Sequence, residues 1–352
     1  MRIQGNRGGM LVGIEVRELV KEDYSFWDEM VDQSEQGSLY HQSEWIQLVG
    51  EHAGVKPVIL GVFEGDSLLG GCSLYALTMY GVLERVTSTA PMTPYGGLCT
   101  FPTRSQQRGE AMRHLHRICT PLVRYLESRY PVIDLVNAPE LTDIRPFIWA
   151  GWKSSVLFTS YLNLQQDIPA NSSSEARRSL KKARASGITV SINRDIHRHY
   201  HLLQMTYERQ GLVPPISEEF MTALVQFVFS RGLGEMWIAE TAEGEDTSSG
   251  IIIWDRKRAH GWSVATDPRF RDAHAQSLVQ LAMFTYLRER GFEVLDMKSA
   301  NVPSIARYYA RYNPVLVPYY RVQKVHRRLG GVAAMKDWLD QSRTRVPDES
   351  KA

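Results

Sequence analysis

The stretch that most constrains the fold lies between Ser249 and Ala300, where the residue pattern changes from strand to helix and back to strand. Residues 250–254 are nearly all apolar and β-branched, a charged turn follows at 255–258, and residues 260–266 return as a second strand. This pattern predicts a β-hairpin. Asp267 and Pro268 then end the second strand, because proline fixes φ and removes a hydrogen-bond donor from the ladder.

A helix and a third strand follow this hairpin. Residues 273–290 carry apolar side chains at helical spacing, among them Leu278, Leu281 and Leu287, and Gly291 is placed as a C-cap glycine. Residues 293–297 then form a strand. The loop before the helix therefore lies where a helix N-terminus presents free N–H groups to a ligand. An ordinary ββαβ segment of any α+β domain has the same order, so the rest of the chain must decide between the two interpretations.

Length and composition indicate a globular protein of two domains. The 352 residues are enough for two domains of typical size, and 43% hydrophobic and 23% charged residues are usual for soluble proteins. No apolar run approaches the roughly 20 residues of a membrane-spanning helix. The first ten residues lack the apolar core of a secretory signal, which favours a cytoplasmic location.

The cysteines and the charge distribution indicate which ligands and partners to expect. Cys72, Cys99 and Cys119 have no spacing typical of metal sites, so we expect reduced core cysteines and no metal. Residues 1–160 hold 14 Lys and Arg against 18 Asp and Glu, whereas the remaining residues hold 27 against 21. A phosphate-rich partner is therefore expected to meet the second half of the chain.

The two halves of the chain share one order of predicted elements. Each half runs strand, two helices, hairpin, strand, helix, strand, short helix and strand. The predicted fold class is α/β with mixed sheets, in two tandem domains of one kind around a central cleft. We expect the domains at residues 11–160 and 161–328, followed by a terminal helix and polar tail at 329–352. Residues 242–248 are predicted to be a solvent loop.

Four segments in the second half carry a family resemblance. They are ARRSLKKARASGITVS at 176–191, TYERQG at 206–211, the Pro-x-Phe-Arg loop with its helix and strand at 265–297, and RYYARYNP at 307–314. In this order they resemble the Fem family of peptidyl- and aminoacyl-transferases and the related GNAT-type acetyltransferase domains. The resemblance extends over about residues 15–325.

This resemblance implies two tandem GNAT-like acyltransferase domains that transfer an acyl or aminoacyl group to an amine acceptor and form an amide bond. In the best-known members the donor is an aminoacyl-tRNA and the acceptor is a peptidoglycan precursor peptide, so the family serves cell wall biogenesis. In related members the donor is an acyl-CoA. We thus expect no bound cofactor, a co-substrate that is aminoacyl-tRNA or acyl-CoA, and no DNA partner. The acceptor is a small-molecule or peptide amine, and a substrate at the membrane surface is compatible with this. A catalytically silent binding protein of the same fold is the other alternative.

Two departures from the family pattern affect the choice of donor. The loop at 271–275 lacks the glycines of CoA-binding members and places Asp272 where a phosphate would lie, which weighs against CoA. Tyr309 stands where the family often has lysine, which weakens the aminoacyl-tRNA alternative. The donor therefore stays open between the two.

The predicted catalytic residues are Asp267, Tyr308 and Tyr309, which are candidates for the proton transfers of acyl transfer. Asp267 has the alternative role of capping the turn before Pro268, and the tyrosines could be packing aromatics. In the resembling fold the oxyanion is held by a strand N–H freed at a bulge, for which residues 263–266 are the candidate segment.

Substrate binding is assigned to basic and aromatic side chains. Arg177, Lys181 and Lys182 lie on one basic helix that is either a phosphate-binding ridge or a solvated face. Arg209 could clamp a carboxylate or phosphate, or instead pair with Glu208 or Glu218. Tyr95 lies in a proline- and glycine-rich run, residues 91–97, that is either a plain loop or a close approach to a ligand. The remaining binding candidates are Arg269, Arg271 and Lys298.

Overall fold

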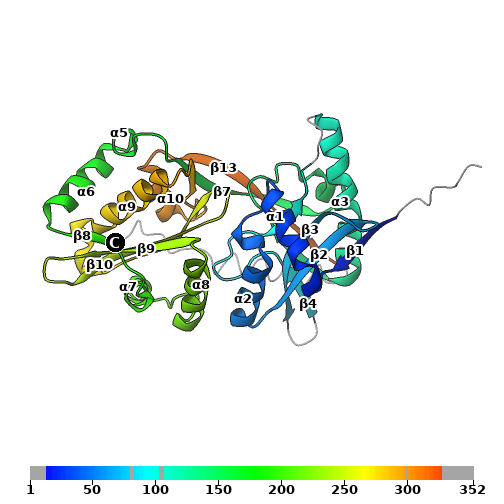
Figure 1. Cartoon of the computed structure of the whole chain (residues 1–352), viewed down its shortest axis with the longest axis horizontal. Helices are drawn as coiled ribbons and strands as arrows, with labels where there is room; N and C mark the ends of the chain where they lie inside the picture. The colour runs from blue at the N-terminus through cyan, green and yellow to red at the C-terminus, as the bar shows by residue number, and fades with distance from the viewer. Residues whose placement is uncertain (1–12, 80–82, 103–106, 299, 327–352) are drawn as a thin grey trace, which may run out of the picture.

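The computed structural model describes residues 13–79, 83–102, 107–298 and 300–326, which form two α/β halves connected by one continuous mixed sheet (Figure 1). The strands are β1 (Ile14–Glu18), β2 (Lys56–Glu64), β3 (Ser67–Met79), β4 (Leu83–Thr87), β5 (Gly97–Thr100), β6 (Val132–Val136), β7 (Lys153–Asn163), β8 (Thr189–Ile192), β9 (Gly234–Glu240), β10 (Asp246–Trp254), β11 (Ala259–Thr266), β12 (Val294–Asp296) and β13 (Val315–Val325). The helices are η1 (Lys21–Asp23), α1 (Tyr24–Gln33), η2 (Leu39–His41), α2 (Ser43–Ala53), α3 (Arg108–Arg129), α4 (Arg145–Trp149), α5 (Ile168–Asn171), α6 (Ser174–Ala185), α7 (Ile196–Glu208), α8 (Glu218–Ser230), η3 (Pro268–Ala273), α9 (Ala275–Glu289) and α10 (Pro303–Ala310).

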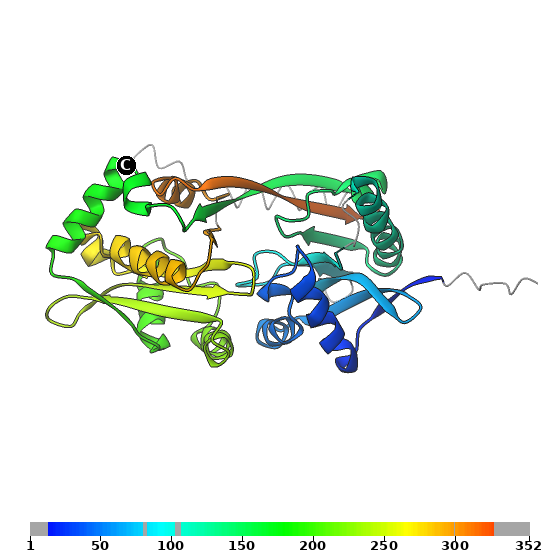
Figure 2. The same ribbon diagram turned by 45° about the horizontal axis from the view of Figure 1, so that its top comes forward.

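The strand order is symmetric about its centre. It runs β1-β2-β3-β4-β6-β13-β7-β12-β11-β10-β9-β8, with β5 paired to β3 outside this path. The last strand of each half crosses over, so that β7 pairs with β12 and β13 pairs with β6. Figure 2 shows these two long strands spanning both halves. The exchange confirms the shared element order, and each half completes the sheet of the other.

Several element boundaries differ from those predicted. The predicted solvent loop at 242–248 is shorter, because Asp246 already pairs with Glu240 and Thr247 donates its hydroxyl to the carbonyl of Ala239. The helix expected from residue 273 begins at Ala275, since His274 adopts a left-handed conformation with φ 55°. The division at residue 160 falls inside β7 and stays a prediction. The tail expected at 329–352 lies outside the described residues.

The helices cover both faces of the sheet and share one core between the halves. In the second half α7 and α8 pack on one face and α9 on the other, so close to β10 that a Cβ at Gly250 would lie 2.6 Å from Met283 Sδ. Buried Trp45 on α2 and Phe220 on α8 belong to a single hydrophobic cluster. Because this cluster is continuous across the boundary, the two halves are packed together rather than merely tethered.

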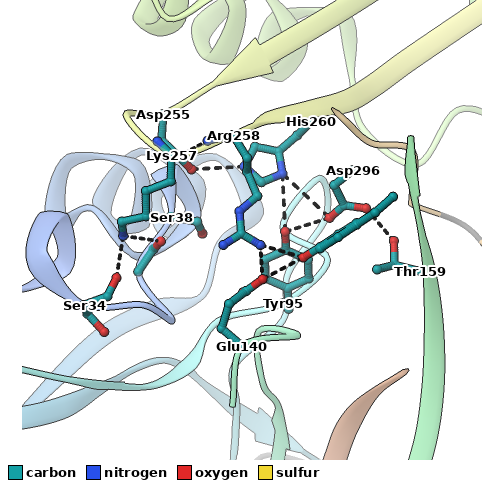
Figure 3. A network of polar contacts seen from close by, with 12 residues as sticks. Ser34, Ser38, Tyr95, Glu140, Thr159, Asp255, Lys257, Arg258, His260 and Asp296 are labelled. Atoms are coloured by element: carbon teal, nitrogen blue, oxygen red, sulfur yellow. Dashed lines mark hydrogen bonds and ion pairs between the residues drawn. The ribbon is translucent and has the colours of Figure 1, made fainter. Parts of the chain in front are cut away.

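The charged turn between β10 and β11, residues 255–258, inserts into the first half (Figure 3). Lys257 Nζ donates to the carbonyls of Val31, Ser34 and Gly37 at 3.0, 2.5 and 2.7 Å. The Asp255 carboxylate accepts from the backbone N–H of Leu39 at 3.2 Å. The turn that the sequence marks as charged therefore anchors one half to the other. We call residues 255–258 the docking turn.

Arg258 of the docking turn forms a mostly buried ion pair with Glu140, with side chains 11% and 21% exposed. We expect Arg258→Met to lower the free energy of unfolding by about 2–4 kcal/mol, because Glu140 loses its partner in a poorly solvated place. Urea denaturation followed by tryptophan fluorescence measures the change. The matched control is Arg117→Met, which breaks an exposed Arg–Glu pair with Glu64 and should change stability by less than about 0.5 kcal/mol. Equal effects of the two substitutions would contradict this role of the docking turn.

Candidate functional site

The candidate site begins where two parallel strands of the second half separate. β11 and β12 pair only at Ala259 with Leu295 and at His260 with Asp296, although β11 continues to Thr266. At Gly261 the two strands are still close, since a Cβ there would lie 3.6 Å from the carbonyl oxygen of Asp296. Beyond this point β11 has no pairing with β12. The sheet is therefore open on this side of β11.

A β-bulge lies at the start of the open edge. On β10, Ile252 faces Gly261 and Ile251 faces Ser263, so Trp262 is the extra residue. Further along, the backbone N–H of Thr266 donates to Thr206 Oγ1 at 3.1 Å and thus points away from β10. Because backbone groups alternate in direction along a strand, the N–H of Val264 points to the same open edge. This amide has the position that an oxyanion-binding donor in the predicted segment would require.

The corresponding strands of the first half remain closed. β4 pairs in parallel with β6 through Thr87 and Asp134, and beyond this pair the Ser88 hydroxyl bonds both backbone groups of Val136. The loop at 91–97 then returns, and the N–H of Gly96 donates to the carbonyl of Val136 at 3.1 Å. The close approach expected for this glycine-rich run is thus to the neighbouring strand. The second half alone has an open strand edge of this kind in the described chain.

A buried polar network lies where the strands separate (Figure 3). Tyr95 donates its hydroxyl to Asp296 Oδ2 at 2.8 Å and lies 3.3 Å from His260 Nδ1. The other ring nitrogen of His260 lies 3.0 Å from the Asp255 carboxylate, and Thr159 donates to Asp296 Oδ1. Burial alone would raise the pKa of Asp296, but Lys298 and His260 hold that pKa well below its usual range. Tyr95, a predicted binding residue, therefore connects the first half to this network.

Lys298, another predicted binding residue, follows β12 directly. Its Nζ lies 4.0 Å from the ring centroid of Tyr40 and 4.7 Å from that of Tyr95. The atom is buried and has no hydrogen-bond partner among the described residues. Burial lowers the pKa of Lys298 to about 7, against the opposing effect of Asp296 and Asp255. Such a shifted, unpaired amine is typical of functional sites.

A second polar group, which the sequence did not reveal, lies beside the bulge. His199 on α7 places Nδ1 2.8 Å from Ser249 Oγ and Nε2 2.8 Å from Ser263 Oγ. The imidazole is fully buried, and burial lowers its pKa to about 3. A neutral imidazole has one N–H, so one serine donates to it and the other accepts. The available signal was a histidine among the apolar positions of an amphipathic helix, which is usually a core histidine.

Asp267 and Arg269 form hydrogen bonds and an ion pair with each other. The Asp267 side chain is buried and accepts from the backbone N–H of Arg269 at 2.8 Å and from its guanidinium at 2.7 and 2.9 Å. Arg269 also contacts Glu245. This geometry is the turn-capping role considered as the alternative for Asp267. Its catalytic assignment stays a prediction without a contact that supports it.

Tyr308 and Tyr309 lie together on α10, partly buried and packed against the hydrophobic cluster of the second half. Tyr308 donates its hydroxyl to Gln280 Oε1 at 3.2 Å, and the two tyrosine rings meet edge to face at 5.5 Å. Burial raises the pKa of both phenols, that of Tyr309 to about 12. Both therefore keep their protons at neutral pH.

The basic helix α6 presents its charged residues to solvent. Lys181 and Lys182 are exposed, and Arg177 is exposed as well but also donates to the carbonyls of Ser172 and Ala170 at 2.5 and 3.2 Å. α6 packs beside α9, and, after burial, the charge of Lys182 is the main factor that lowers the pKa of His274 at the start of α9. Positive charge thus gathers at the N-terminus of α9, which no side chain caps.

The two remaining predicted arginines are exposed. Arg271 lies on η3 before α9, and Arg209 follows α7, one helical turn beyond Thr206. The alternative pairing of Arg209 with Glu208 or Glu218 does not occur in the described structure, and Glu218 contacts His197 instead. Since Thr206 contacts the end of β11, Arg209 lies near the far end of the open edge.

A pocket of about 480 Å³ lies between the halves. His52 on α2 stacks on Phe220 of α8 with 5.2 Å between ring centroids, and the lining also includes Tyr75 of β3 and Ile216. No helix in the described part of the chain is long and apolar enough to cross a membrane. Within the same residues, no cluster of three His, Cys, Asp or Glu side chains could hold a metal ion.

Comparison with known proteins identifies the class to which this geometry belongs. Residues 170–308 match the family model described as an acetyltransferase (GNAT) domain, so the second half of the chain carries a GNAT-type acyltransferase domain. No curated protein matches the chain. The family-model match at residues 170–308 lies in the same half of the chain as the open strand edge of β11.

Solved structures extend the likeness to the whole fold. FemX has a TM-score of 0.64 at 12% identity, covering 87% of this chain and 96% of its own. A tandem GNAT protein from the clavulanic acid biosynthesis pathway has a TM-score of 0.53 at 14% identity, and the match covers 89% of this chain and 98% of that protein. L-PGS from Bacillus licheniformis has a TM-score of 0.53 at 9% identity, and the match covers 90% of this chain and 94% of that protein. The chain therefore has the tandem GNAT fold, as the Fem-family resemblance predicted.

The buried His199 should make stability depend on pH. Its pKa is about 3 in the folded protein and 6.5 when unperturbed, so only the unfolded chain binds a proton between these values. Stability then falls as the pH falls below 6.5. We expect His199→Gln to reduce this slope by an amount that rises from about 0.7 kcal/mol per pH unit at pH 6.5 toward the limit of about 1.4 near pH 5, measured by urea denaturation across this range. Parallel slopes for the variant and the parent protein would contradict a neutral buried imidazole.

Proposed function

We propose that this protein transfers an acyl or aminoacyl group to an amine acceptor and forms an amide bond. The observation that carries the proposal is the open edge of β11, where pairing with β12 stops at His260 while a bulge follows, and then the Val264 N–H, which points to the open edge. A donor carbonyl that lies along this edge would accept a hydrogen bond from the Val264 N–H. The amine then attacks the carbonyl carbon, and the bond to the leaving oxygen or sulfur breaks.

An aminoacyl-tRNA is the donor that we favour, because the exposed positive charge lies on α6, which contacts α9 and the η3 segment that follows β11. Lys181 and Lys182 are free to contact a phosphate backbone, and the glycine-poor loop at 271–275 lacks the flexibility of a tight pyrophosphate cradle. Similarity to FemX in fold is compatible with this donor and with a peptidoglycan precursor peptide as acceptor. A cytoplasmic location would follow from either.

An acyl-CoA is the second candidate donor. The uncapped N-terminus of α9, with Lys182 and Arg311 near His274, is suited to a pyrophosphate. Asp272 is exposed and opposes this attraction. For either donor we place the acceptor amine at the open edge of β11, where it would meet the donor carbonyl.

Charge reversal on α6 distinguishes the two donors. We expect Lys181→Glu combined with Lys182→Glu to weaken binding of bulk aminoacylated tRNA at least tenfold, because two phosphate contacts become repulsive. Filter binding at two salt concentrations measures this, with acetyl-CoA binding by calorimetry alongside. The control combines Lys21→Glu with Lys153→Glu, two exposed lysines of the first half that change net charge equally. Unchanged tRNA binding, or tight binding of acetyl-CoA alone, would overturn the tRNA assignment.

A further inference from the structure

Two residues directly beyond the point where β11 and the segment after β12 separate have an unused hydrogen-bond donor in their side chains. They are Trp262, which follows Gly261, and Lys298, which follows Met297; Gly261 and Met297 make the last close contact of the two segments. Trp262 Nε1 and Lys298 Nζ are both buried without a partner among the described residues. A buried unpaired donor is costly, so such atoms call for an explanation.

The two donors border one aromatic cluster that both halves build. Trp262 meets Trp45 at 6.3 Å between ring centroids, Trp45 meets Tyr40 at 5.4 Å, and Lys298 Nζ lies 4.0 Å from the Tyr40 centroid. Trp45 and Tyr40 come from the first half, so the surroundings of Lys298 exist only when the halves are docked. Lys298 as a residue keeps partial exposure although its Nζ is buried. Part of Lys298 therefore reaches the surface, whereas its amine lies beneath it, against the rings of Tyr40 and Tyr95.

The backbone holds Lys298 in an unfavourable conformation. Its φ is 56°, in the left-handed region that costs a non-glycine residue about 1 kcal/mol or more. The Asp296 carboxylate compensates by accepting the Lys298 backbone N–H at 3.0 Å, and Thr159 and Tyr95 hold that carboxylate in place. Strain supported in this way directs the side chain to a fixed place, which is common at functional sites.

The charged groups around Lys298 come from several elements. Asp296 on β12 and Asp255 of the docking turn favour the ammonium, whereas burial and Arg258 disfavour it. Tyr40, Tyr95 and His260 complete the surroundings. Burial is the largest effect, so the pKa of Lys298 is about 7 and much of the amine is unprotonated at neutral pH.

The other titratable groups of this network are engaged or are poor bases. Both ring nitrogens of His260 have partners, and both oxygens of Asp296 accept hydrogen bonds. The Tyr40 hydroxyl has no hydrogen-bond partner among the described residues, but burial raises the pKa of this phenol well above its usual range, so it keeps its proton. Lys298 is therefore the basic group of this described network whose lone pair no neighbour uses when the amine is neutral.

We propose that Lys298 is the catalytic base that takes the proton from the attacking amine of the acceptor. This inference rests on the proposed acyl transfer. The acceptor nitrogen forms its bond to the donor carbonyl carbon and passes one proton to Lys298 Nζ. The carbon–oxygen or carbon–sulfur bond of the donor breaks, and Lys298 returns the same proton to the leaving oxygen or sulfur. No other reactant is needed for the proton balance.

The first test observes the amine directly. Protein labelled with ¹³C at the lysine ε-carbon is titrated by NMR from about pH 5.5 to beyond the ordinary lysine pKa of about 10.4, and Lys298→Arg assigns the resonance. We expect one lysine resonance with a midpoint near 7 that is missing from the variant. Titration of every lysine near its ordinary pKa, about 10.4, would overturn the proposal.

The second test measures transfer from acetyl-CoA and from aminoacylated tRNA to amine acceptors as a function of pH. Lys298→Arg keeps the charge but cannot accept a proton, so we expect kcat/KM to fall about 100-fold or more and the acid limb near pH 7 to disappear. Lys324→Arg, whose side chain lies on the first half near Glu127, should leave the profile unchanged. Activity retained in Lys298→Arg would overturn this inference alone, whereas a parent protein inactive with both donors would overturn the proposed function together with it.

Discussion

The insertion of the docking turn into the first half is the interaction on which the rest of the structure depends. Lys257 donates to three carbonyls at and just beyond the C-terminal end of α1, and those carbonyls compensate the ammonium for lost water. The same turn places Asp255 against His260 and Arg258 against Glu140. One short segment thus fixes both the relative position of the halves and the groups at the separation of β11 and β12.

The site is a product of both halves, although only one of them has an open strand edge. The first half closes its own edge with Ser88 and Gly96 and contributes Tyr40 and Tyr95 to the second. The exchanged strand β7 contributes Thr159 to the same network. A duplicated fold can in this way form a single candidate site, because the second half has the open strand edge and the first half contributes side chains beside it.

Much of the fold was predictable because hydrophobic periodicity is a local property. The hairpin, helix and strand between Ser249 and Ala300 are present with small shifts, and the shift at His274 comes from one left-handed residue that periodicity does not detect. The symmetric order of elements was likewise visible. The exchange of β7 and β13 was not, since strand pairing partners depend on chain paths rather than on composition.

The candidate site was predictable only where a residue acts through its place in a motif. Lys181, Lys182 and Arg209 are exposed as a basic helix and a helix end would have them. Arg177, on the same ridge, bonds to carbonyls that precede its helix, which spacing along the helix does not reveal. His199 and Ser263 are 64 positions apart and meet only when α7 packs on β11. Such contacts are long-range and specific, and a single sequence contains no measure of them.

What the sequence by itself determined is the class of structure: alternating strands and helices in two similar halves, a basic second half, and an open loop before the helix of residues 273–290. What only the tertiary structure decided is where the chemistry lies. Lys298 is one lysine among many in the sequence, and its altered basicity arises from burial between rings of the other half. Local patterns set secondary structure because neighbouring residues interact directly, whereas the state of an ionisable group depends on desolvation and charges from residues far away along the chain.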